Sequence, residues 1–175
     1  MGGNMRVAKL SGLGIACFCL AFSQPVKAEM LTLGTASGGQ QIKLDTNSIQ
    51  RNGNTGSWWS GFTYYLGNER LEAGAHCGRG IWTVDGEQYS PQSKATENML
   101  SIVCSARHIR EVEDIGYSLV FDPPSNVRSS PGGAVKCTLE KMTVIPVYVE
   151  PKNGWYSTQA CGGGWIHESQ IRAFR

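Results

Sequence analysis

The sequence is short of charge and has no apolar run long enough to cross a bilayer. Charged residues make up 17% of its 175 residues, and the apolar stretch from Leu10 to Phe22 is too short to span comfortably. The first 28 residues contain no acid but carry Arg6, Lys9 and Lys27, and small residues flank Lys27 where a signal peptidase reads the chain. The sequence therefore predicts a signal peptide over Met1 to Ala28 and export to the periplasm or the medium.

No excess of positive charge remains once that segment is removed. The three basic residues of the signal leave 13 Lys+Arg against 14 Asp+Glu, so the formal charge falls from +2 to −1. Such a chain offers no electrostatic footprint for nucleic acid or an anionic membrane. We expect a mature protein without a membrane span.

Cysteine is scarce outside the signal. Cys77, Cys104, Cys137 and Cys161 remain, and an oxidising compartment favours disulfides between them. Four cysteines allow three pairings. The favoured pairing is Cys77 with Cys104 and Cys137 with Cys161, since each bridge then closes a loop of roughly 25 residues within one module. A lipid anchor at Cys17 is disfavoured, because Gly14 stands where a lipobox needs an aliphatic residue.

Metal and thiol chemistry are the alternatives for these cysteines. There is no CxxC spacing and the three histidines are dispersed, so we predict no metal and no cofactor. His76 beside Cys77 suggests a catalytic pair, yet neighbouring strand residues point to opposite faces. A disulfide would also consume the thiol, and we expect a structural role.

The chain has 22 Gly and 7 Pro, which favour turns and short strands. Alternation or β-rich composition predicts strands within 40–45, 57–66, 70–77 and 80–84. The period then changes to about 3.6 from Pro91, with apolar residues at 95, 99, 102, 103 and 106, which predicts a helix over 92–106. The charged stretch at 108–116 is expected to be a linker.

Short segments separated by turns follow the linker. They lie at 117–121, 134–139, 142–149, 154–160 and 164–171, with a turn-rich stretch at 122–133, and their spacing is typical of a small β-barrel. Pro146 within a strand predicts an edge or a bulge. The fold class is therefore mainly β: an N-terminal α+β module over 29–107, with antiparallel strands and one helix, followed by a barrel over 117–175.

Three spaced motifs in the second half carry a family resemblance. They are Asn126-Val127-Arg128-Ser129-Ser130-Pro131, then Gly154-Trp155-Tyr156, then Gly164-Trp165-Ile166-His167, with a valine-rich strand at 144–149. The segment 120–173 resembles a bacterial SH3 (SH3b) domain. The resemblance implies an SH3-like β-barrel that acts outside the cytoplasm as a non-catalytic binder of cell-wall peptide, peptidoglycan or envelope proteins. Cys137 and Cys161 depart from the family pattern.

The first half is similar to surface-adhesin protein E-like modules of exported bacterial proteins. Leu44-Asp45, Ser48-Ile49 and Arg51-Asn52-Gly53 stand before an aromatic strand, and Cys77, Trp82, Ser90-Pro91-Gln92-Ser93, Met99-Leu100 and Val103-Cys104 follow in order over 31–106. This resemblance implies the α+β fold and a bridge between Cys77 and Cys104. It does not define an activity.

Binding through the barrel is the first functional hypothesis. Exposed aromatics and a few polar groups should form the groove, because amphipathic rings supply contact area at little entropic cost. The expected ligand-binding residues are Arg128, Tyr148, Trp155, Tyr156 and His167. Arg128 has an alternative role as a brace for its loop, and Trp165 is expected in the core.

Two other functions are weighed against it. Adjacent Trp58 and Trp59 cannot both face one core if they lie in a strand, so one of them is either exposed or packed under the neighbouring module. An exposed Trp would make the first module the working surface of an adhesion or protein-interaction factor. Glu111, Glu113 and Asp114 cluster, but a hydrophilic connector lacks the apolar pocket that general acid catalysis needs. We therefore predict no enzyme.

Overall fold

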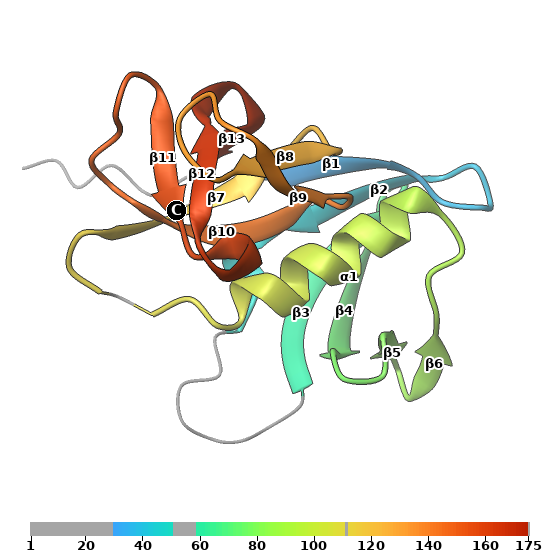
Figure 1. The fold of residues 1–175 in the computed structure, drawn as a ribbon. Coiled ribbons are helices and arrows are strands. Elements are labelled where there is room, and N and C mark those ends of the chain that lie inside the picture. Colours follow the sequence, from blue (N-terminus) through green and yellow to red (C-terminus); the bar gives the residue numbers. More distant parts are fainter. Residues whose placement is uncertain (1–29, 51–58, 111, 175) are drawn as a thin grey trace, which may run out of the picture.

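The computed structural model describes residues 30–50, 59–110 and 112–174. The predicted signal peptide and the residues Trp58 and Glu111 lie outside this part of the chain. Within it, two antiparallel sheets and one helix make up the fold (Figure 1). The predicted fold class, mainly β with a single helix, is confirmed. No helix in the described part is long and apolar enough to cross a membrane.

The first sheet is an antiparallel meander, in which every strand pairs with its neighbours in sequence. Short turns make this possible: between β5 and β6, Asp85 and Gly86 adopt φ values of 50° and 87°, a turn that suits Asp-Gly. The sequence did not predict the first and last of these strands. The strands are β1 (Met30–Thr35), β2 (Gln41–Asp45), β3 (Trp59–Leu66), β4 (Glu69–His76), β5 (Ile81–Val84) and β6 (Glu87–Tyr89).

Helix α1 spans Lys94–Ala106 and starts two residues later than predicted. Ser93 is its N-cap and forms a capping box with Thr96, whose hydroxyl also accepts the N–H of Gln92 at 3.0 Å. Pro91 therefore lies before the helix. All five apolar positions that predicted the helix are buried: Ala95, Met99, Ile102, Val103 and Ala106.

Helix α1 lies between the two sheets and packs against β1 on one side and β10 on the other (Figure 1). Leu119, Val144 and Phe174, which come from the second half of the chain, belong to the same buried cluster as α1 and the first sheet. Two hydrogen bonds reinforce the packing. Asn98 Oδ1 accepts the N–H of Met142 at 3.2 Å, and Ser105 Oγ accepts the N–H of Val144 at 2.9 Å.

The second sheet has the strand order β13-β7-β10-β11-β12-β8-β9. It curls, so that the Gln170 side chain, just before β13, meets the backbone of Asn126 in β8, near the opposite end of that order. Its strands are β7 (Ile115–Val120), β8 (Ser125–Arg128), β9 (Val135–Leu139), β10 (Thr143–Tyr148), β11 (Trp155–Thr158), β12 (Gly164–His167) and β13 (Ile171–Ala173).

Several boundaries in this half differ from prediction. Strand β8 lies inside the stretch predicted as turns, because its four residues carry too weak an alternation against the flanking Pro, Ser and Gly. The single segment predicted over 164–171 is broken by a 3₁₀ turn at Glu168–Gln170. Strand β7 begins at Ile115, inside the predicted linker.

Pro146 lies neither at a sheet edge nor in a bulge, contrary to the prediction. It sits in regular register opposite Tyr117 in β7. On its other side, β10 pairs with β11 only through Val147 and Thr158, and Thr158 Oγ1 donates to the Pro146 carbonyl at 2.7 Å. The backbone nitrogen of Pro146, which has no N–H, therefore faces β11, where almost no ladder hydrogen bonds are made.

Both favoured disulfides are present. Cys77 pairs with Cys104 and joins the end of β4 to α1, while Cys137 pairs with Cys161 and joins β9 to the 3₁₀ turn at Ala160–Gly162. The Cα atoms are 5.5 and 6.2 Å apart, within the usual range for a bridge. One disulfide thus links the first sheet to α1, and the other links β9 of the second sheet to the turn before β12.

Candidate binding site

The hairpin of β11 and β12 separates the predicted ligand-binding residues onto two faces. Trp155 is paired directly with His167, so both project from one face. Tyr156 is paired with Ile166 and projects from the opposite face, towards the buried cluster of the second sheet. The predicted residues therefore do not form one groove.

His167 and Arg128 both have local structural partners. The His167 ring meets Trp155 edge to face with centroids 5.0 Å apart, and its Nδ1 lies 2.8 Å from Ser169 Oγ. Arg128 donates from Nη1 to the carbonyl of Gly133 at 2.7 Å and braces the 129–133 turn. This is the alternative role that the sequence analysis gave to Arg128.

Trp165 is not in the core, contrary to prediction. It is half-buried on the face of Trp155 and His167, and the Lys152 ammonium lies 5.7 Å from its ring centroid. The neighbouring Ile166 is fully buried instead. The family-like motif places its large ring outside and its aliphatic residue inside, because successive strand residues face opposite sides.

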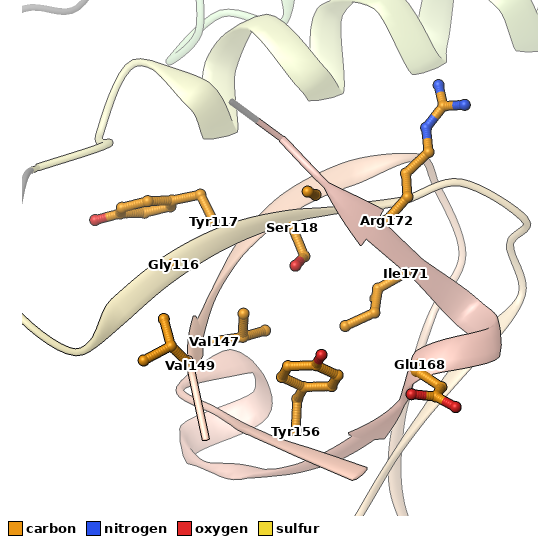
Figure 2. Close-up of a pocket in the computed structure, with 10 residues that line it drawn as sticks. Gly116, Tyr117, Ser118, Val147, Val149, Tyr156, Glu168, Ile171 and Arg172 are labelled. Atoms are coloured by element: carbon orange, nitrogen blue, oxygen red, sulfur yellow. The ribbon is translucent and has the colours of Figure 1, made fainter. Parts of the chain in front are cut away.

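A pocket opens on the face of Tyr156. It has a volume of about 320 Å³ and lies among β7, β10, β11 and β13, and we call it the Tyr156 pocket. Figure 2 shows Ser118, Val147, Tyr156 and Ile171 turned towards a common centre, whereas Tyr117 and Arg172 point away from it. Tyr148, 42% exposed at the end of β10, does not line this pocket.

The walls of the Tyr156 pocket are apolar, and its polar groups are few. Val147, Val149 and Ile171 supply the walls, while Ser118, Tyr156 and Glu168 supply two hydroxyls and a carboxylate (Figure 2). Within the described part of the chain, none of these three side chains has a hydrogen-bond or ion-pair partner. They are therefore available to a ligand.

Gly116 keeps one wall of the pocket open. A Cβ at this position would lie 3.4 Å from Val149 Cγ1 and 3.9 Å from Val147 Cγ2. A larger side chain there would occupy space that now belongs to the pocket. The backbone of Gly116 pairs with Val147 in regular register, so the absence of a side chain, rather than unusual backbone geometry, is what this position contributes.

Sequence reasoning identified Tyr156 but missed the other lining residues. Gly116, Ser118 and Glu168 are separated from Tyr156 by up to 40 positions and meet it only after the sheet curls. One signal was present, since Ser118 interrupts an apolar strand at a position that alternation places on a covered face.

The described part of the chain contains no group of three His, Cys, Asp or Glu side chains arranged to hold a metal ion. Of the acidic cluster considered above, Glu113 and Asp114 are exposed before β7, and Glu111 lies outside the described residues. His76 and Cys77 do not form a reactive pair, because the Cys77 sulfur is bonded to Cys104.

Comparison with known proteins finds no relative. No protein family, no curated protein and no solved structure matches this chain. The resemblances to SH3b and adhesin-E-like modules therefore stay predictions.

Proposed function

We propose that this protein is an exported, non-catalytic binding protein of the bacterial cell envelope, whose Tyr156 pocket holds a short segment of cell-wall peptide. The observation that carries the proposal is the set of unpartnered polar groups, Ser118, Tyr156 and Glu168, placed around apolar walls. Two disulfides fit a protein that works in an oxidising compartment.

The chemistry of the Tyr156 pocket suits a small peptide segment. Its valine and isoleucine walls accept methyl groups, while two hydroxyls can bond a peptide amide and thereby fix its orientation. The Glu168 carboxylate at the rim suits an ammonium group. Wall stem peptides combine alanine methyls, amides and an amine-bearing residue, whereas a purely apolar ligand would leave all three polar groups unused.

The test is sedimentation of the oxidised, exported protein with isolated peptidoglycan sacculi, in parallel with capture from an envelope protein extract. Tyr156→Ala removes a side chain that lines the pocket, and Gly116→Val fills part of its volume. Each variant should weaken the binding measured by sedimentation by about tenfold or more. Tyr148→Ala is the matched control, because it removes an exposed tyrosine from the same sheet outside the pocket. It should leave sedimentation unchanged.

The outcomes separate the possible ligands. Sedimentation that depends on Tyr156 supports wall binding. If the protein does not sediment with sacculi but captures one envelope protein, and this capture depends on Tyr156, the ligand of the pocket is a protein. Retention by neither sacculi nor extract, or equal loss in all three variants, would overturn the proposal.

A second candidate function rests on Trp59. Its side chain is 41% exposed on the face of the first sheet that α1 does not cover, where it packs on Gly74 and His76. This placement favours the adhesion or protein-interaction alternative. Trp59→Ser that abolishes capture of an envelope protein at an unchanged melting temperature would support it, whereas strong destabilisation would assign Trp59 to packing.

A further inference from the structure

A second cavity lies on the first sheet, far along the chain from the Tyr156 pocket. It has a volume of about 420 Å³ and is lined by residues of β3, β4 and the β5–β6 hairpin, at the end of the strand order opposite β1 (Figure 1). Leu66, Leu71 and Val84 form its apolar part. We call it the acidic cavity for the groups at its rim.

Three carboxylates surround this cavity, and no basic residue lines it. They belong to Glu69, Asp85 and Glu87, and none has an ion-pair partner in the described part of the chain. The nearest guanidinium in sequence, that of Arg70, projects from the opposite face of β4 and pairs there with Glu72 at 2.8 Å. The negative charge at the rim is therefore left for a ligand to neutralise.

Two tyrosines complete the lining. Tyr89 donates its hydroxyl to Glu87 Oε2 at 2.9 Å, which orients that carboxylate. That hydrogen bond and the charge of Glu87 raise the pKa of Tyr89 above its ordinary value, and burial together with the charge of Glu69 raises the pKa of Tyr64. Aromatic faces beside carboxylates are a favourable setting for an organic cation.

The Trp82 indole lies beside the acidic cavity. It is 4% exposed, and its ring stacks on Tyr89 with centroids 5.9 Å apart. Its N–H makes no full hydrogen bond within the described part of the chain, but it lies close enough to the Tyr64 hydroxyl to oppose the rise in the Tyr64 pKa. Trp82, Tyr64 and Tyr89 thus place aromatic rings on the same side of the sheet as the three carboxylates.

The lining excludes a simple metal site. Within the described part of the chain no three acidic side chains lie close enough together to hold a metal ion, and much of this cavity is leucine, valine and aromatic carbon. Lysine and arginine fit better, since each carries an apolar stem of several carbons below a charged head. The stem would lie on the leucines and valine, and the head would reach the carboxylates.

We propose that the acidic cavity receives a lysine or arginine side chain from a basic segment of a protein partner. This interaction is independent of the Tyr156 pocket, which belongs to the other sheet. With both sites occupied, the protein would connect a basic partner to its envelope ligand.

The probe is a tetralysine peptide with blocked ends, compared with the same peptide acetylated on every side chain. Titration of the isotope-labelled, oxidised protein should give saturable amide shifts at the residues of the acidic cavity with the cationic peptide only. Raising the ionic strength from about 0.01 M to about 1 M, which shortens the Debye length from roughly 30 Å to 3 Å, should weaken the binding.

Two triple variants make the test specific to the acidic cavity. Glu69→Gln with Asp85→Asn and Glu87→Gln removes the three rim charges, and Asn tolerates the positive φ of position 85. This variant should bind the peptide about tenfold more weakly. The control carries Glu72→Gln, Glu140→Gln and Glu150→Gln, which changes the net charge equally at exposed sites elsewhere and should bind normally.

Three results would overturn the proposal: equal weakening in both triple variants, shifts confined to other surfaces, or no binding of tetralysine at low salt. None of them bears on the Tyr156 pocket, because sedimentation with sacculi is measured on variants that leave the acidic cavity intact.

Discussion

Trp155 and His167 face each other across the β11–β12 hairpin with their ring centroids 5.0 Å apart and their planes at 67°. This edge-to-face arrangement is the favourable geometry for an aromatic pair. Because His167 also accepts the N–H of Ser169 through Nδ1 at 3.3 Å, its ring holds the 3₁₀ turn that leads into β13. Two residues expected to bind ligand thus stabilise each other.

His167→Ala is therefore expected to affect stability rather than binding. It removes the aromatic pair and one hydrogen bond, and should lower the free energy of unfolding by about 1–2 kcal/mol. Chemical denaturation measures this loss, and a double-mutant cycle with Trp155→Ala isolates the pair. If His167→Ala instead abolishes sacculus binding at unchanged stability, His167 contacts the ligand.

Asn98→Ala tests whether the two sheets unfold together. The buried Asn98 amide accepts the N–H of Met142 across the contact between α1 and β10, so its loss leaves that N–H unpaired. We expect a decrease of about 1–3 kcal/mol in a single unfolding transition. Two separate transitions, with only one of them shifted, would show that the sheets are independent modules.

Each disulfide should contribute similarly to stability, since 27 and 24 residues separate the paired cysteines. The chain-entropy relation predicts a loss of about 3.5 kcal/mol for Cys77→Ser with Cys104→Ser, and nearly the same for Cys137→Ser with Cys161→Ser. Denaturation of both double variants without reductant measures the two losses. A negligible effect of either pair would contradict this expectation.

The contact of Trp59 with Gly74 is also testable. A Cβ on Gly74 would lie 3.0 Å from Trp59 Cε3, so Gly74→Ala should cost about 1–3 kcal/mol by overpacking. The matched double variant Gly74→Ala with Trp59→Ser should recover part of that loss, as measured by thermal unfolding. Equal losses in the presence and absence of the indole would show that Trp59 does not lie on Gly74.

Acid should destabilise the fold through two histidines. Desolvation and the positive charge of Arg79 lower the pKa of His76, and desolvation with Arg107 and Arg110 lowers the pKa of His108. Below about pH 6.5 the unfolded chain therefore binds more protons than the folded protein does. The free energy of unfolding decreases from about pH 6.5 down to the lowered pKa values of the folded protein. His76→Asn with His108→Gln should flatten this dependence. An unchanged pH profile would contradict it.

The amino-acid sequence by itself determined the elements with a strong local signal. The helix followed from five apolar residues at helical spacing, and the central strands of the first sheet followed from β-rich runs between turns. The disulfide partners followed from the division into two modules, because the favoured pairing closes one loop of roughly 25 residues within each module. Tyr156 was found because it belongs to the Gly154-Trp155-Tyr156 motif that carries the SH3b resemblance, and because aromatic rings suit a binding groove.

Only the tertiary structure decided what those elements do together. Alternation along a strand defines two faces but not which face is covered, so Trp165 was expected in the core and is found half-buried on the other face, while Ile166 is buried. The Tyr156 pocket needs Ser118 and Glu168, which are brought to Tyr156 by the curl of the second sheet. Local spacing carries no information on such distant contacts, because the packing of α1 between the sheets and the pairing of non-consecutive strands create them.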